Sequence, residues 1–274
     1  MKTICISDLD GTLLGRDGRI SAFSCETLNQ LLRQGLQFTY ATARSYVSSA
    51  KALNGLTALD FPVIVYNGAA ICDGRSGKVL SEVHFQGKDV LAVRKFLEAR
   101  RIYPLVYSGL RGTERVRWLK GAENDGICNY LESRSGDRRL CAASSLDELY
   151  EGEIFYFTCI GPREGLLPVY EHFRLESFCS CMLQQELYQE EYFCELTPRN
   201  ATKQEGVNQV RRMMGADQVI VFGDRINDLP LFKAADRCFA VENAADELKR
   251  AADEIIASNE EDGVAHVIEK FFLK

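Results

Sequence analysis

Two aspartates stand close together just after the first apolar segment of the chain. Asp8 and Asp10 follow Ile4-Cys5-Ile6, and Gly11 comes directly after them. In an extended chain their side chains share one face, and carboxylates so close repel each other unless a cation lies between them. Gly11 permits a sharp turn and a close approach of the backbone to a ligand. This pair of aspartates, taken alone, is compatible with a polar loop and with a functional site.

A second group of acids has the same setting near the other end of the chain. The apolar run Val219-Ile220-Val221-Phe222 ends at Gly223, and Asp224 and Asp228 follow. Ligands of α/β sheets gather outside the carboxyl ends of the strands, so both acidic groups are expected at one edge. Hard carboxylate oxygens in such a cluster suit Mg²⁺. An N-cap role would account for Asp228 but not for Asp224.

Two further segments carry groups that could bind an anion. Thr42-Ala43-Arg44-Ser45 follows a strand pattern, and a hydroxyl with backbone N–H groups at a helix N-terminus forms an anion site. Lys203 is the only basic residue between Arg199 and Arg211. Each has a simpler interpretation on its own, as a helix N-cap and as a solvated surface lysine.

The elements around these segments indicate an α/β fold. Strand and helix patterns alternate over roughly the first eighty residues and again over the last eighty, which is typical of βαβ units and a parallel sheet. Ser21 is placed to cap a helix that stops at Gly35, and Gly215 closes another. Phe61 to Tyr66 is nearly all apolar, as in a strand buried on both faces.

The pattern of apolar residues in the middle of the chain differs from that at both ends and predicts a second domain. It has one clear helix pattern (Val90, Val93, Leu97), separate strand-like runs, and a polar loop from Ser133 to Arg139. The simplest organisation is one α/β domain made from residues 1–83 and 191–274. An α+β domain of residues 84–190 is then inserted into it.

The composition and net charge exclude several classes of protein. The 274 residues are 46% hydrophobic and carry a net charge of −6, so a folded protein without a nucleic-acid partner is expected. No apolar run reaches the roughly 18 residues of a membrane span, and the first residues do not resemble a signal peptide. The ten cysteines are expected to be reduced thiols of a cytoplasmic protein, without zinc-ligand spacing.

The four segments together resemble the haloacid dehalogenase superfamily of phosphohydrolases, most closely its Cof-type members. The resemblance rests on Asp8-Leu9-Asp10-Gly11-Thr12-Leu13-Leu14, Thr42-Ala43-Arg44, Lys203 and Gly223-Asp224-Arg225-Ile226-Asn227-Asp228, in that order. Tyr66-Asn67-Gly68-Ala69 and Val241-Glu242-Asn243-Ala244 also match. It covers both ends of the chain and implies a Rossmann-like core with an α+β cap inserted between the second and third motifs. Ala43 departs from the pattern, which usually has glycine there.

The resemblance also implies roles for these residues. Asp8 is the expected nucleophile, and Asp10 the expected general acid and base. Mg²⁺ would be held by Asp8, the backbone carbonyl of Asp10, and Asp224, with Asp228 in a supporting role. Thr42 and Lys203 are expected to act on the transferring phosphoryl group. Phosphate or substrate binding is expected of the set Gly11, Thr42, Ala43, Arg44, Asn67, Lys203 and Asn227.

The expected reaction is Mg²⁺-dependent hydrolysis of a small phosphorylated metabolite, with sugar phosphates first and phosphorylated cofactors next. A hexose phosphomutase stays open as an alternative. A receiver-like signalling domain would be near 120 residues without an insertion, and no Gly-x-Gly-x-x-Gly of a dinucleotide site follows a strand. We expect a monomer or weak homodimer. Arg111 to Arg117, Tyr103, Tyr107 and Tyr156 are candidates for reading the substrate, although surface or core positions explain them more simply.

Overall fold

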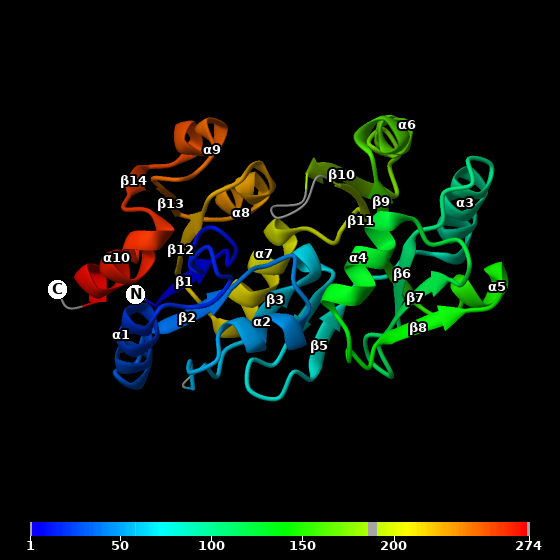
Figure 1. Ribbon diagram of the computed structural model, residues 1–274. Coiled ribbons are helices and arrows are strands. Elements are labelled where there is room, and N and C mark those ends of the chain that lie inside the picture. Colours follow the sequence, from blue (N-terminus) through cyan, green and yellow to red (C-terminus); the bar gives the residue numbers. More distant parts are fainter. Residues whose placement is uncertain (1, 58, 186–190, 273–274) are drawn as a thin grey trace. The chain divides into compact units, whose positions relative to one another are not determined.

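The computed structural model describes residues 2–57, 59–185 and 191–272. The chain divides into two compact units, one of Met1–Ser81 with Thr202–Lys274 and one of Glu82–Ala201. The first unit is thus built from both ends of the chain, and the second is inserted into it (Figure 1).

The second boundary differs from the predicted one. Residues 191–201 were expected in the first unit, but β11 (Tyr192–Pro198) pairs antiparallel with β10 (Cys179–Gln185) and β9 (Ile154–Gly161) of the inserted unit. Its alternating pattern suits either sheet, so only the pairing decides where it belongs.

The first unit is built around a parallel sheet, which confirms the α/β prediction. Among the described residues, five strands pair in the order β14-β13-β12-β1-β2. Their bounds are β1 Thr3–Ser7, β2 Gln37–Tyr40, β12 Gln218–Gly223, β13 Arg237–Val241 and β14 Glu254–Ile256. The first and last parts of the chain meet at β1 and β12, which are neighbours in this order.

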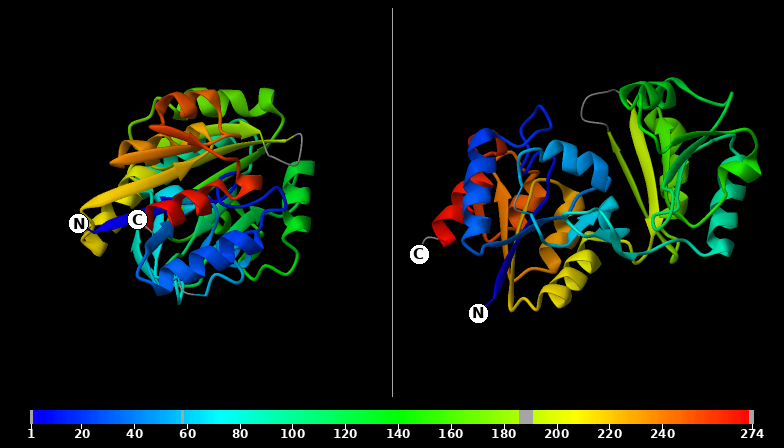
Figure 2. Two further views of the ribbon diagram at one scale, coloured as in Figure 1. Left: turned by 90° about the vertical axis from the view of Figure 1, so that its left-hand side faces the viewer. Right: turned by 90° about the horizontal axis from the view of Figure 1, so that it is seen from below.

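Helices and a small second sheet complete the first unit, with helices on both sides of the parallel sheet (Figure 2). The helices are α1 Ala22–Arg33, α2 Tyr46–Ala52, α7 Lys203–Met214, α8 Leu229–Lys233, α9 Asp246–Ala251 and α10 Gly263–Phe272. The 3-10 turns are η1 Tyr66–Gly68, η2 Ile226–Asp228 and η3 Asn259–Glu261. The small sheet consists of β3 Val63–Val65, β4 Ala70–Cys72 and β5 Val79–Glu82, and Glu82 at the end of β5 is the first residue of the inserted unit.

The predicted helix caps are confirmed. The Ser21 side chain accepts a hydrogen bond from the Ser24 amide at the start of α1. Gly215 ends α7 in the left-handed conformation at φ 59°, which glycine adopts without steric cost. The apolar run from Phe61 forms β3, and β3 joins the end of β2 through a bridge between Ala41 and Ile64.

The inserted unit is an α+β domain with one mixed sheet, in the order β10-β11-β9-β6-β7-β8. Its remaining elements are α3 Gly87–Glu98, β6 Leu105–Ser108, β7 Arg115–Leu119, α4 Asp125–Ser133, β8 Leu140–Ala143, α5 Leu146–Leu149 and α6 Arg163–Phe173. Its apolar core takes Leu97 from α3, Leu166 from α6 and Phe157 from β9. The predicted loop from Ser133 to Arg139 is confirmed for residues 134–139, whereas Ser133 is the last residue of α4.

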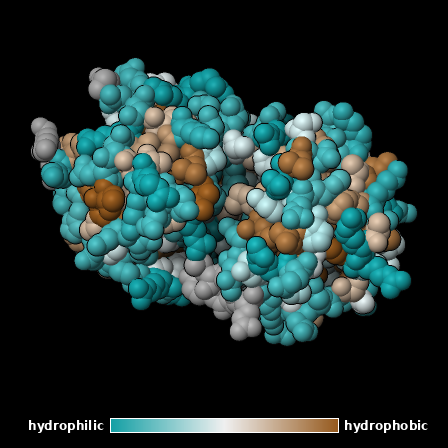
Figure 3. Space-filling model, turned by 90° about the horizontal axis from the view of Figure 1, so that it is seen from above, coloured by the Kyte–Doolittle hydropathy of each residue, from teal (hydrophilic) through white to brown (hydrophobic). Residues whose placement is uncertain are grey.

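The face shown in Figure 3 is mostly hydrophilic. On this face, hydrophobic residues form scattered patches among polar ones. Among the described residues, no helix combines the length and apolar character that crossing a bilayer requires. The ten cysteines are all free thiols, and six of them are buried.

Candidate active site

The two acidic groups meet where β1 and β12 end, as their positions after two strands predicted. Ser7 pairs with Phe222 in the parallel register, and the Asp8 amide still donates to the Phe222 carbonyl at 3.0 Å. Asp8 and Asp224 come next along the two strands, and each is only 6% exposed. Neighbouring parallel strands thus deliver two buried carboxylates to one edge of the sheet.

Lys203 joins this acidic cluster from the first turn of α7. Its Nζ donates to Asp8 Oδ1 at 2.5 Å and to Asp228 Oδ1 at 2.7 Å. The side chain is 2% exposed, so the interpretation as a solvated surface lysine is wrong. A charged ammonium group tolerates such burial because two carboxylates compensate it.

Asp228 closes the turn that follows β12. Its Oδ2 accepts from the backbone N–H groups of Asp224 at 3.0 Å and Arg225 at 3.2 Å. It makes no side-chain cap to α8. Both of its oxygens therefore hold other groups of the acidic cluster and its turn. Asn227 lies half-buried in the same turn.

Three carboxylates are close enough to share a cation. Oxygens of Asp8, Asp224 and Asp228 lie within 4.8 Å of one another, and all three residues are buried. Lys203 and Arg225, whose Nε lies 3.5 Å from Asp224 Oδ2, supply two positive charges against three acids, so the cluster favours a further positive charge. The donor set consists of hard oxygens, which fits Mg²⁺. Asp228 uses both oxygens to hold Lys203 and the backbone of the turn after β12, and Asp224 also accepts from Thr12, so Asp8 and Asp224 remain the ligands expected from the sequence.

Burial and mutual repulsion set the protonation of this cluster. Burial raises the pKa of Asp8 well above its ordinary value, Lys203 acts in the opposite direction, and the neighbouring acids add to the increase. Burial and Asp228 raise the pKa of Asp224 to about 7. Burial acts to lower the pKa of Lys203, but Asp228 and Asp8 raise it above its ordinary value. Without a metal ion, Asp8 and Asp224 therefore hold their protons to higher pH than ordinary aspartates do.

We expect magnesium stabilisation to depend on pH. Between the ordinary aspartate pKa of about 4 and the raised value of Asp224, the folded chain binds more protons than the unfolded chain. Asp224 therefore makes the metal-free protein less stable as pH rises through this window. Magnesium needs ionised ligands, so its stabilising effect grows over the same range, to about 2.7 kcal/mol at 100 Kd.

Thermal unfolding at pH 5.5 and pH 8, with magnesium or with EDTA, tests this expectation. The increase in Tm on adding magnesium should be larger at pH 8. Asp224→Asn is the control, because it removes the titrating ligand and should flatten the pH dependence of that increase. An increase in Tm equal at both pH values in the unsubstituted protein would contradict the assignment of Asp224 as a ligand.

The Gly11 loop packs directly against Asp224. Gly11 has φ +81°, and a Cβ added to it would lie 2.4 Å from Asp224 Oδ2. The Thr12 hydroxyl donates to Asp224 Oδ1 at 3.1 Å, and the Asn243 amide donates to the Gly11 carbonyl at 2.7 Å. Thr12 and Asn243 were not among the predicted site residues, although both stand in the quoted motifs. Thr12 and Asn243 thus hold the Gly11 loop against the Asp224 carboxylate.

Gly11→Ala is expected to weaken metal binding. The methyl group would displace the Asp224 carboxylate, and the left-handed backbone adds about 1–3 kcal/mol of strain. We expect the magnesium concentration for half-maximal activity to rise at least about tenfold. Gly35→Ala is the matched control, because Gly35 also has positive φ but no atom lies within 4 Å of its added Cβ. Equal effects of the two substitutions would show that the contact with Asp224 is unimportant.

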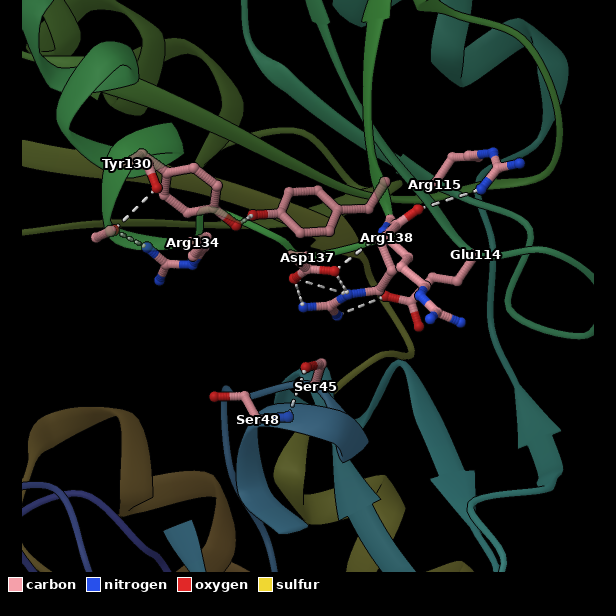
Figure 4. Close-up of polar contacts among 11 residues, drawn as sticks. Ser45, Ser48, Glu114, Arg115, Tyr130, Arg134, Asp137 and Arg138 are labelled. Carbon is pink, nitrogen blue, oxygen red and sulfur yellow. Dashed lines mark hydrogen bonds and ion pairs between the residues drawn. The ribbon is translucent and has the colours of Figure 1, made fainter. Parts of the chain in front are cut away.

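The Thr42 segment lies at the end of β2, and its interpretation as a helix N-cap is confirmed at Ser45, not at Thr42. Thr42 Oγ1 accepts from the Arg44 amide at 3.1 Å, and Ser45 caps α2 by accepting from Ser48 N at 3.2 Å (Figure 4). Ala43 has no positive φ, so the backbone there suits a residue with a side chain. The backbone N–H of Asn67 donates to the Thr42 carbonyl at 2.9 Å. Thr42 and Asn67 are thus brought together.

Arg44 binds Asp10. Its Nε donates to Asp10 Oδ2 at 2.8 Å, and its Nη2 donates to Asp10 Oδ1 at 2.5 Å. The Asp10 side chain is therefore turned towards Arg44 and is not part of the buried carboxylate cluster. Nothing in the sequence pattern indicated this pair, because side-chain orientation does not follow from spacing.

In the inserted unit, most of the suggested substrate-reading residues are held within the domain. Tyr107 is buried, and its hydroxyl group lies 2.9 Å from that of Tyr130 (Figure 4). Tyr156 is also buried. Arg117 forms an ion pair with Glu151, and Arg111 with Glu82. These contacts agree with the simpler core and surface interpretation.

Comparisons with known proteins agree with this arrangement. The family model of haloacid dehalogenase-like hydrolases matches residues 5–268. The 5-amino-6-(5-phospho-D-ribitylamino)uracil phosphatase of Bacillus subtilis is 28% identical over 98% of both chains. A crystal structure from Thermotoga maritima has the same fold, with a TM-score of 0.81, 24% identity, and coverage of 98% of this chain and 97% of that one. A sugar phosphatase of haloacid dehalogenase subclass IIB has a TM-score of 0.76 and 22% identity over the full length of both chains. The chain therefore belongs to the haloacid dehalogenase-like hydrolases and is an enzyme of that family.

Proposed function

We propose that this enzyme is a Mg²⁺-dependent phosphatase that releases phosphate from a small phosphorylated metabolite through an aspartyl-phosphate on Asp8. The observation that carries the proposal is the buried Asp8 carboxylate, held between Lys203 and Asp224 at the end of β1. A buried carboxylate beside a fixed ammonium group is suited to attack an anionic substrate, because the positive charge offsets repulsion.

In the first half of the reaction, a carboxylate oxygen of Asp8 forms a bond to phosphorus, and the bond from phosphorus to the ester oxygen breaks. Asp10 gives its proton to the departing oxygen, which leaves as an alcohol. In the second half, Asp10 takes a proton from the attacking water. The water oxygen forms a bond to phosphorus as the bond from phosphorus to Asp8 breaks, which restores the Asp8 carboxylate and releases inorganic phosphate.

Asp8, Asp224 and the backbone carbonyl of Asp10 would hold the metal ion. Magnesium at this position supplies charge neutralisation between the carboxylate and the phosphate dianion. Asp228 keeps Lys203 and the turn after β12 in place.

The phosphoryl group is proposed to lie among donors from several loops. Lys203 reaches it from α7, and Thr42 lies at the end of β2. Gly11, Ala43, Asn67 and Asn227 complete the proposed phosphate and substrate contacts. Such positioning and charge supply most of the rate enhancement in phosphoryl transfer.

The substrate class we propose is a sugar phosphate or a closely related polyol phosphate. Two similarities support this class. One relative is named as a phosphatase of a phosphoribitylamino-uracil, and one structure of the same fold is named as a sugar phosphatase. Both names describe a phosphate ester on a polyhydroxylated carbon chain.

Phosphate release from a panel of esters tests the proposal. The panel holds p-nitrophenyl phosphate, hexose and pentose phosphates, ribitol phosphate and phosphorylated cofactors, each with magnesium or with EDTA. We expect release with magnesium only, and fastest release from the sugar and polyol phosphates. Isomerisation of a hexose phosphate without net release would instead establish a mutase, and release undiminished by EDTA would refute the metal dependence.

A further inference from the structure

The contact between Arg44 and Asp10 is the most specific feature of the site that the proposed function does not use. One guanidinium edge meets both oxygens of one carboxylate, at 2.8 and 2.5 Å. The two side chains are 24% and 32% exposed, so solvent reaches both. A bidentate arginine–carboxylate pair fixes the orientation of the carboxylate as well as its charge.

The backbone around Arg44 holds the guanidinium group in place. The Arg44 amide donates to Thr42 Oγ1 at 3.1 Å, and its carbonyl accepts from the Tyr66 amide at 3.0 Å. Tyr66 and Asn67 both have positive φ, at 51° and 54°, which is rare for residues with a side chain. Such strained backbone persists where surrounding contacts enforce it. The arginine is thus presented from a precisely shaped turn next to the phosphate-binding threonine.

We propose that Arg44 is a positioning residue for Asp10. This inference rests on the proposed function and differs from the phosphate-binding role expected of Arg44 from sequence. The guanidinium edge made of Nε and Nη2 faces Asp10, so binding phosphate through this edge would require breaking the pair.

The observed pair fixes the orientation of Asp10 for the proton transfers assigned to it. In the second half of the proposed reaction, Asp10 takes the proton from the water that hydrolyses the aspartyl-phosphate, and this transfer needs the Asp10 side chain in one fixed orientation. Arg44 keeps its own proton throughout and holds the carboxylate in one orientation while Asp10 receives one. Positioned groups contribute through geometry, and a loose base loses this advantage.

A double-mutant cycle tests the role of Arg44. With magnesium and p-nitrophenyl phosphate, Arg44→Ala should lower kcat about 10- to 100-fold and change KM less than about threefold. In an Asp10→Ala background, the same substitution should change kcat less than about twofold, since its target is gone. Quenched samples of Arg44→Ala should contain a larger fraction of phosphorylated enzyme than the unsubstituted protein. The kcat of Arg44→Lys should lie between those of the unsubstituted protein and Arg44→Ala, because lysine keeps the charge but loses the bidentate geometry.

The control is a second pair of the same geometry. Arg75 contacts both oxygens of Asp60 at 2.8 and 2.5 Å, on the exposed surface of the same unit. Arg75→Ala should leave kcat and KM within about twofold. Thermal unfolding checks that each variant is folded, and Arg44→Lys serves if Arg44→Ala is not.

The outcomes distinguish the positioning role of Arg44 from the proposed phosphatase activity. Losses that multiply in the double variant, or a large rise in KM, would show that Arg44 acts on the substrate directly and would overturn this inference alone. An unsubstituted protein without phosphate release from any ester would overturn the proposed function, and this inference with it.

Discussion

Asp8→Asn is expected to lower kcat by at least about 10⁴-fold. The amide has nearly the shape of the carboxylate, so it fits the same buried position, but it is a poor nucleophile and carries no charge for Lys203. Phosphate release under saturating ester and magnesium measures the effect, with circular dichroism as the test of folding.

Asp60→Asn is the matched control for this prediction. Asp60 is also an aspartate of the first unit, but it is exposed and pairs only with Arg75 among the contacts described above. Its substitution should leave kcat within about twofold. If a folded Asp8→Asn protein kept a tenth of the activity, another group would have to be the nucleophile.

Lys203→Met is expected to damage both activity and stability. The methionine fills a similar volume but leaves Asp8 and Asp228 buried without their shared cation. Breaking a buried ion pair on one side costs about 3–5 kcal/mol, and we expect the free energy of unfolding to fall by about that much. We expect kcat to fall about 10²- to 10³-fold, as for the loss of one electrostatic group at a reacting centre. Urea unfolding and the ester assay measure the two effects.

Adding Asp228→Asn to Lys203→Met distinguishes the electrostatic explanation from a simple packing defect. The second substitution removes one of the two uncompensated charges, so the double variant should recover part of the lost stability. It should recover no activity, because Lys203 is still missing. A double variant whose stability loss is the sum of both single losses would contradict the shared-cation account of this cluster.

The sequence was most informative where local rules act alone. Asp8 and Asp224 could be placed at one edge because each follows a buried run, and the ends of parallel strands converge. Ser21 and Gly215 mark helix ends through their own backbone and side-chain chemistry. The two-part first unit followed from similar patterns at both ends of the chain.

The sequence was uninformative where the structure depends on contacts between residues that are far apart in the chain. Lys203 alone looked like a surface lysine, and its burial depends on two acids that reach it only in the folded chain. The alternating residues of β11 suit either sheet, so the domain boundary fell at the wrong strand. The pair between Arg44 and Asp10 joins side chains 34 residues apart, and the spacing of the two residues does not predict how their side chains are oriented.

The most direct test of the central claim is to locate the covalent phosphate. Enzyme mixed with p-nitrophenyl phosphate and magnesium is quenched in acid during turnover, digested, and analysed by mass spectrometry. Borohydride treatment of a second sample converts an aspartyl-phosphate into homoserine, which marks the residue permanently. The account predicts phosphate, and homoserine after reduction, at residue 8 and at no other acidic residue. Turnover with residue 8 unmodified, or with the label on another side chain, would contradict it.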